Sequence, residues 1–222
     1  MLKTLFFMAA CVCWTGAIAG NVQIQVLDRD GTPVPDVVVV LYPDNTTGAA
    51  PRLVPDSATI GQEKMRFVPA VTVVATGSTV RFTNLDRWDH HVRGNADGAA
   101  AGNAAGTGFE LRLSGKKEGS EASFAEVQLQ APGAVLLGCH LHSSMRGHVF
   151  VSDSAWAIKT DGNGIARFAS VPEGAAQVRV WHAEQLLDLP PKPLQVLPGS
   201  VLDTLQLSVV PRRRRAPARE GG

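Results

Sequence analysis

The residues with the clearest capacity for chemistry lie between positions 139 and 145. This segment places a thiol at Cys139, an imidazole at His142 and a thioether at Met145, with two residues between each donor and the next. Upstream, the adjacent residues His90 and His91 offer further imidazoles. Two imidazoles and a thiolate in one plane, with a weak axial thioether, form a blue-copper electron-transfer site. The spacing therefore indicates a metal centre whose sulfur and imidazole donors suit copper in both oxidation states.

The thiol of Cys139 needs a protective role if the chain is exported. Residues 1–19 are typical of a secretory signal peptide, because Lys3 precedes a short apolar run and residues 17–19 have a small-x-small pattern. Cleavage removes the other two cysteines, and a lone exposed thiol would oxidise in such a compartment. We expect a soluble periplasmic protein, without stable membrane insertion, whose cysteine is buried, metal-bound or catalytic.

Composition fits a globular β protein and excludes several functional classes. Hydrophobic residues make up 45% of the chain and charged residues 18%, which is too apolar for wholesale disorder. Residues 211–222 form an Arg-rich tail that we expect to be disordered. Without this tail and Lys3, 15 basic and 19 acidic residues remain. Phosphate binding needs a basic face, so we expect no nucleic-acid partner.

Alternating apolar residues predict strands along most of the chain. The pattern is clear at residues 22–26, 80–83, 109–113 and 135–139, and no segment keeps a helical period. The expected fold class is therefore all-β, built from sandwiches. Residues 94–108 are mostly Gly, Ala and Asn, and this composition predicts a flexible loop.

Residues 58–153 resemble a whole cupredoxin domain of the plastocyanin and amicyanin type. The similar segments are Phe67-x-Pro69-x-Val71-x-Val73, Gly77-x-x-Val80-x-Phe82-x-Asn84 and Leu137-Gly138-Cys139-x-x-His142-x-x-Met145-Arg146-Gly147. The chain is also similar to bacterial plastocyanin-like proteins associated with methylamine utilisation, in His90-His91-Val92 and Val180-Trp181-His182. The resemblance implies a Greek-key β-sandwich, copper as the cofactor and electron transfer as the activity.

The same resemblance implies a ligand set. His90, Cys139 and His142 would be the equatorial ligands, and Met145 the axial one. His90 is preferred to His91 because the family pattern is His-x-Val, and strand alternation turns His91 to the opposite face. The role of the His91 side chain stays open.

Other polar residues near these ligands have two interpretations. Asn84 and Asp86 either hold the ligands from behind or form a turn, and the turn is favoured. His140 alternates away from the site, so we expect it at the surface, together with His148. His182 is distant in sequence and is expected to be structural.

Segments near both ends of the chain resemble parts of a carboxypeptidase-regulatory-like β-sandwich. Residues 20–50 resemble its opening, and residues 154–210 resemble its later part. Each half has too few strands to bury a face alone. We therefore expect one smaller split sandwich, with the cupredoxin domain inserted between its halves. The alternative is that the N-terminal strands extend the cupredoxin sheet.

Three functions are compatible with the donor set. The first is a type 1 copper protein that passes single electrons between redox partner proteins, acting as a monomer through small, weak interfaces. The second is copper binding and delivery without redox turnover. The third is a Cys–His nucleophilic enzyme, but the sequence suggests neither an oriented base nor an oxyanion hole, so no catalytic residues are expected. Zinc is disfavoured because it rarely takes a Met ligand.

Overall fold

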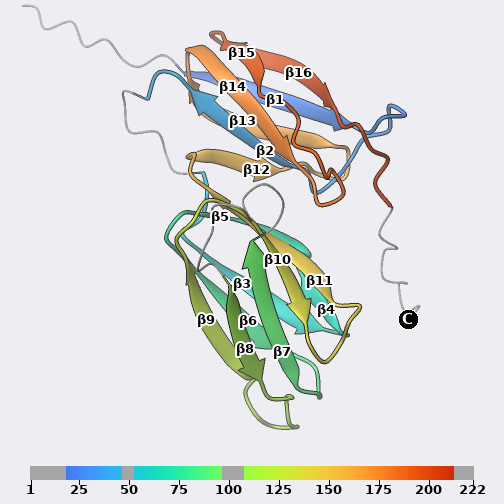
Figure 1. The fold of residues 1–222 in the computed structure, drawn as a ribbon. Coiled ribbons are helices and arrows are strands. Elements are labelled where there is room, and N and C mark those ends of the chain that lie inside the picture. The colour runs from blue at the N-terminus through green and yellow to red at the C-terminus, as the bar shows by residue number, and fades with distance from the viewer. Residues whose placement is uncertain (1–18, 47–52, 97–107, 213–222) are drawn as a thin grey trace, which may run out of the picture.

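The computed structural model describes residues 19–46, 53–96 and 108–212, and the regular structure in these ranges is entirely β-strand. The expectation of an all-β fold is confirmed. The signal-like segment up to residue 18, most of the Gly- and Ala-rich segment and residues 213–222 lie outside the described residues. Among the described residues no helix is long and apolar enough to cross a membrane. Figure 1 shows the strands arranged as two stacked bodies.

The upper body in Figure 1, here called the terminal sandwich, combines strands from both ends of the chain. Its sheets have the orders β13-β1-β16 and β12-β2-β14-β15. The strands are β1 (Ala19–Leu27), β2 (Val38–Pro43), β12 (Trp156–Lys159), β13 (Ile165–Pro172), β14 (Gly174–Trp181), β15 (Lys192–Val196) and β16 (Ser200–Gln206). β1 pairs antiparallel with β13 and parallel with β16, so its two neighbours come from the C-terminal part of the chain.

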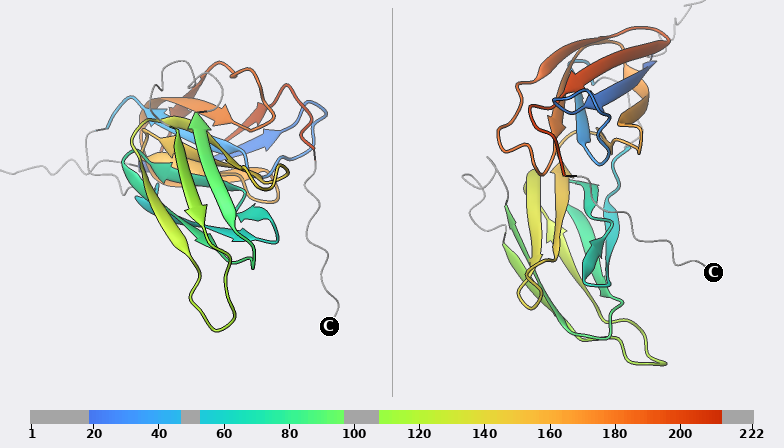
Figure 2. Two further views of the ribbon diagram at one scale, coloured as in Figure 1. Left: turned by 60° about the horizontal axis from the view of Figure 1, so that its bottom comes forward. Right: turned by 90° about the vertical axis from the view of Figure 1, so that its right-hand side faces the viewer.

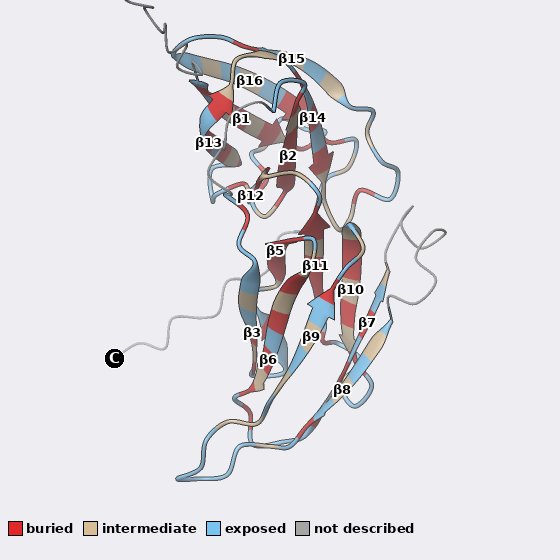
Figure 3. Ribbon diagram, turned by 90° about the vertical axis from the view of Figure 1, so that its left-hand side faces the viewer, coloured by how far each residue is buried: buried red, intermediate tan, exposed pale blue. Residues whose placement is uncertain are grey.

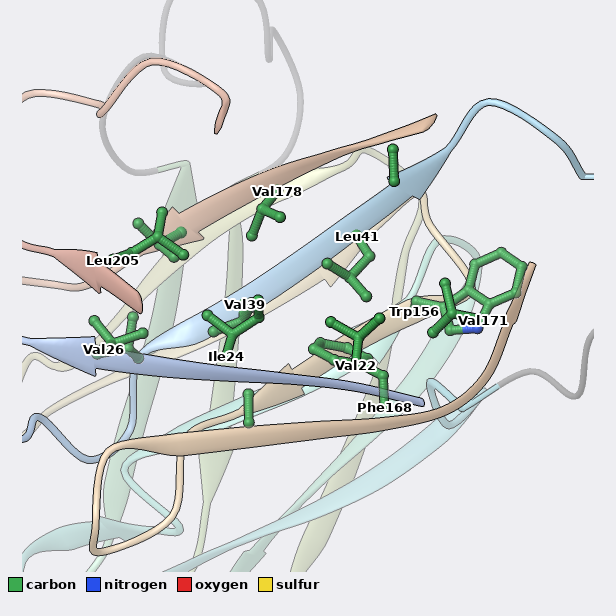
Figure 4. Close-up of a cluster of buried hydrophobic side chains, with 14 of the residues drawn as sticks. Val22, Ile24, Val26, Val39, Leu41, Trp156, Phe168, Val171, Val178 and Leu205 are labelled. Carbon is green, nitrogen blue, oxygen red and sulfur yellow. The ribbon is translucent and has the colours of Figure 1, made fainter. Parts of the chain in front are cut away.

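The core of the terminal sandwich is apolar and comes from both chain segments. Val22, Ile24 and Val26 alternate inward along β1, and they belong to one buried cluster with Leu41 and Phe168 (Figure 4). Full burial of such a side chain stabilises the fold by roughly 1.5–3 kcal/mol. Since neither segment holds this core alone, we propose that residues 20–50 and 154–210 form one domain, interrupted by an inserted one.

The lower body, here called the central sandwich, consists of the intervening strands. Its sheets have the orders β5-β11-β10-β7-β8 and β4-β3-β6-β9. The strands are β3 (Ser57–Glu63), β4 (Arg66–Val68), β5 (Val71–Ala75), β6 (Ser78–Asn84), β7 (His90–Ala96), β8 (Phe109–Leu113), β9 (Phe124–Leu129), β10 (Gly133–Cys139) and β11 (Arg146–Ser152). A second buried cluster fills the space between these sheets.

The predicted loop at 94–108 begins later than expected. Gly94 and the two residues after it belong to β7, where they pair with β10. The glycine has a packing role, since a Cβ built on Gly94 would lie 2.2 Å from the ring of Phe109. The prediction of a flexible loop is therefore wrong at Gly94, where the ring of Phe109 covers the backbone of a paired strand. Residues 97–107 lie outside the described residues.

The outer faces of the two sandwiches pack against each other. Val38 and Val40 on β2 belong to a third buried cluster with Val71 on β5. Trp181 lies edge-on to the ring of His148, with 5.2 Å between ring centroids. The expectation that His148 is exposed is therefore wrong, since it is only 7% exposed. Figures 2 and 3 show the stacked bodies, with buried residues reaching the junction between them.

Candidate metal centre

The candidate ligands converge because two antiparallel strands end at the same place. His90 begins β7, Cys139 ends β10, and His142 follows in the turn before β11. β7 and β10 pair so that Cys139 lies opposite Val92. β11 runs from this turn towards the terminal sandwich, so the site lies at the far end of the central sandwich, the lower end in Figure 1.

Three of these side chains, here called the inner cluster, are spaced for a shared metal. The Sγ atom of Cys139 lies 3.7 Å from Nδ1 of His90 and 3.6 Å from Nδ1 of His142. Metal–sulfur bonds of about 2.3 Å and metal–nitrogen bonds of about 2.0 Å, set 120° apart, would separate the donors by about 3.7 Å. Cys139 and His90 are buried, while His142 is partly exposed. The inner cluster thus has the spacing with which one sulfur and two imidazole nitrogens would hold a metal ion.

Met145 lies in the same buried cluster as Cys139. Its side chain is 1% exposed, and its backbone N–H donates to the carbonyl of His142 at 3.0 Å. This tight turn returns the chain to the core three residues after His142. Met145 is therefore the candidate fourth donor, a weak thioether buried in the same cluster as the Cys139 thiol.

A buried carboxylate fixes the orientation of His90. Nε2 of His90 lies 3.0 Å from Oδ2 of Asp86. The same carboxylate accepts two backbone N–H groups, that of Lys64 at Oδ1 (2.6 Å) and that of Met65 at Oδ2 (2.9 Å). Burial raises the pKa of the Asp86 carboxyl, but these amides and the His90 ring outweigh it and hold that pKa below its ordinary value. The ionised carboxylate needs a donor, so Nε2 carries the proton and Nδ1 is free to face Cys139.

This contact corrects the sequence interpretation of Asp86, for which a turn role was favoured. Asn84 does have that turn role. Its side-chain amide donates to the carbonyls of Trp88 at 2.8 Å and Ser114 at 3.0 Å, and its oxygen accepts the N–H of Asp86 at 2.9 Å. Asn84 thereby braces the turn that delivers both Asp86 and His90.

A second group of donors lies on the outer face of the same strands. His91, Glu110 and His140, here called the outer cluster, have donor atoms within 4.8 Å of one another. His140 is exposed as expected, and the side chain of His91, whose role was open, bonds to Glu110. The sequence analysis missed Glu110. Its alternation with Phe109 and Leu111 places it outward, but only the register of β7 with β8 shows that it faces the histidines.

His182 has a local structural contact, in line with the sequence interpretation. It follows β14, and its Nδ1 accepts the backbone N–H of Glu184 at 3.2 Å. This bond holds a turn of the terminal sandwich. His182 belongs to neither cluster of donors found among the described residues.

Part of the chain is similar to known copper proteins. Residues 54–152 match the family model of copper binding proteins of the plastocyanin/azurin family. Solved structures with a similar fold include amicyanin from Paracoccus versutus (22% identity, covering 50% of this chain and 97% of that one, TM-score 0.33). A mutant fern plastocyanin is 21% identical, covers 42% of this chain and 99% of its own, and has a TM-score of 0.33. A copper-containing nitrite reductase from Thermus scotoductus is 20% identical, covers 50% of this chain and 25% of its own, and has a TM-score of 0.34. No curated protein matches the chain.

Proposed function

We propose that the cupredoxin domain formed by residues 54–152 carries single electrons between redox partner proteins, with copper held by His90, Cys139, His142 and Met145. The observation that carries this proposal is the inner cluster, in which a buried sulfur lies 3.6–3.7 Å from two imidazole nitrogens. Copper supplies the one-electron change between its +1 and +2 states. The donor set fits it, because sulfur ligands favour Cu(I) and imidazole serves both states.

The protein's contribution is to hold the donors in one arrangement. Asp86 is itself fixed by two backbone amides and by burial, so the His90 ring cannot turn without breaking a buried hydrogen bond. Cys139 is anchored at the end of β10 between two paired strands. A site that rearranges little between oxidation states favours fast electron transfer. Burial also protects the thiol from oxidation.

Electrons would enter and leave through His142, the partly exposed member of the inner cluster. Its neighbour Leu141 is 58% exposed. Further apolar side chains are exposed at the same end of the sandwich, around the Asp86 turn: Met65, Leu85 and Trp88. Exposed apolar patches of this kind mark interaction sites. We therefore place transient partners at this end, where a monomer could bind them one after another.

The proposed compartment is the periplasm. Residues 1–19 have the pattern of a signal peptide, and Cys139 is the only cysteine after them. A lone thiol is compatible with an oxidising compartment when it is buried and metal-bound. Export of a reporter fused to residues 1–25 would support this location, and cytoplasmic retention would contradict it.

Protein-film voltammetry of the copper-loaded chain separates electron transfer from copper delivery. We expect one reversible one-electron wave, with the copper content unchanged after repeated cycles in the presence of a Cu(I) chelator. Loss of copper to the chelator on the first reduction would contradict the carrier and favour delivery. The matched control is Cys139→Ser, in which the wave should be absent.

A further inference from the structure

The outer cluster arises from the same strand alternation that builds the inner one. His91 follows His90 on β7, and His140 directly follows Cys139 at the end of β10, so each is turned to the opposite side of the sheet. Glu110 comes from β8, which pairs with β7 on its other edge. Two sets of donors thus occupy the two faces of one sheet, back to back.

The distances within the outer cluster suit a metal ion. Nε2 of His91 lies 3.1 Å from Oε2 of Glu110, and Nε2 of His140 lies 3.2 Å from Oε1. The two rings are tilted by 42°, with centroids 4.6 Å apart. A tetrahedral ion with bonds of about 2.0–2.1 Å separates its ligands by about 3.3 Å. A metal ion could therefore replace the protons of these two histidine–carboxylate hydrogen bonds with little movement of the side chains.

The backbone under the outer cluster is rigid. The N–H of His140 donates to the carbonyl of His91 at 3.0 Å, which ties the ends of β10 and β7 together. Glu110 lies opposite Arg93 in the regular register between β7 and β8. Three paired strands therefore set the positions of the donors, and no flexible loop is needed to bring them together.

Charges of both signs surround the outer cluster, because Arg112 lies opposite His91 and Arg93 lies opposite Glu110 in the pairing of β7 with β8. The carboxylate of Glu110 supplies the negative charge for a cation, and its two oxygens contact Nε2 of His91 and Nε2 of His140. The exposed fractions of the side chains are 17% for His91, 38% for His140 and 61% for Glu110. An ion here would keep at least one position open to water.

We propose that the outer cluster is a second metal site, which takes a divalent ion such as Zn²⁺ or Cu²⁺. Two imidazoles and a carboxylate with an open position are a donor set that zinc uses in proteins, and imidazole also suits Cu²⁺. The outer cluster lacks the sulfur donors that select Cu(I), so its chemistry differs from that of the inner cluster. The proposal concerns different residues and does not depend on electron transfer at the inner cluster.

Zinc titration of the copper-loaded full chain, followed by calorimetry, tests this second site. We expect one zinc to bind in addition to copper. Substitution of a donor, by Glu110→Gln or His140→Gln, should raise the zinc Kd at least about tenfold, since even groups that only support ligands cost about 10–100-fold. The matched control is Glu126→Gln, which removes a carboxylate on β9 that pairs with Arg81 and leaves the outer cluster intact.

The outcomes are distinct. No zinc binding beyond copper, or equal zinc affinity in the donor variants and the wild type, would overturn the second site and leave a hydrogen-bonded surface cluster. An unchanged visible copper band in each variant shows that the chain is folded. If the inner cluster takes no copper, the proposed electron carrier fails, while the comparison of Glu110→Gln with Glu126→Gln still tests the outer cluster.

Discussion

The inner and outer clusters differ in burial, although their histidines and cysteine are neighbours along the same two strands. Cys139 is 4% exposed and His90 1%, whereas His140 lies in solvent with the exposed carboxylate of Glu110. The degree of burial decides which metal-binding side chains are stable in each cluster. A thiol survives export when it is covered, and an ionised carboxylate without a buried partner is stable only where water reaches it.

The clusters also differ in how their histidines are held. The inner ring of His90 is oriented by a buried carboxylate, Asp86, which is itself bonded to two amides. The outer rings of His91 and His140 bond to the exposed Glu110 and contact each other. We infer that the inner cluster is prearranged for one ion, whereas the outer cluster is more adaptable and exchanges its ion readily.

Among the variants that test this difference between the clusters, we expect the largest change in metal affinity from two alanine substitutions on β7. His90→Ala should weaken copper binding by more than about 100-fold, because even supporting residues around metal ligands cost about 10–100-fold. His91→Ala, one residue away, should leave copper affinity close to the wild-type value and reduce zinc binding instead. Competition titration with chelators of known affinity measures both. Equal copper losses in the two variants would contradict the assignment of His90.

Removing the support of the inner cluster should have the next largest effect. Asp86→Asn keeps the size of the side chain but removes the charge that orients His90, so we expect copper affinity to fall about 10–100-fold. The matched control is Asp89→Asn, whose exposed carboxylate accepts the N–H of Gly115 at 2.8 Å. A fall in melting temperature with no change in copper affinity would show that Asp86 is merely structural.

A smaller effect should link the two faces of the sheet. Zinc in the outer cluster adds positive charge behind the inner one, and positive charge favours the less charged Cu(I) state. The reduction potential of the copper should therefore rise when zinc binds, and this rise should disappear in Glu110→Gln. Voltammetry at low and high salt measures it. A potential that is insensitive to zinc, in a chain shown to bind it, would contradict electrostatic coupling.

The smallest effect is expected in the terminal sandwich, far from both clusters. The hydrogen bond from Arg167, with the amides of Ile165 and Asn163, holds the pKa of Asp161 below its ordinary value of 3.8. Its contribution to stability is therefore present above about pH 4 and is lost as pH falls through the lowered pKa. Asp161→Asn should lower the melting temperature slightly at neutral pH and not at the most acid pH. Thermal melts across this range, with copper binding as the control, measure the effect.

The sequence predicted the features that depend on alternation along a strand. The all-β class follows from period-two patterns, and the same patterns place Cys139 inward and His140 outward. The proposed ligands His90, Cys139 and His142 are brought together because β7 and β10 are antiparallel and meet at their ends. Alternation is a local property, so it can be read without knowing which strands pair.

Features that depend on pairing or on packing between sandwiches were missed. Glu110 is recognisable only from the register of β8 with β7, and Asp86 only from the turn that Asn84 braces. His148 was expected in solvent because alternation turns it outward from the central core, but the terminal sandwich covers that face with Trp181. In each case the missing information was the identity of a neighbour distant in sequence.

The visible absorption spectrum of the Cu²⁺-loaded chain, measured beside Cys139→Ser, tests the copper centre most directly. We expect an intense thiolate-to-copper band that bleaches reversibly with reductant and is absent from the variant, since the proposed site depends on the Cys139 sulfur. A colourless wild-type protein, or a band that persists in Cys139→Ser, would contradict the assignment of the inner cluster as a type 1 copper site.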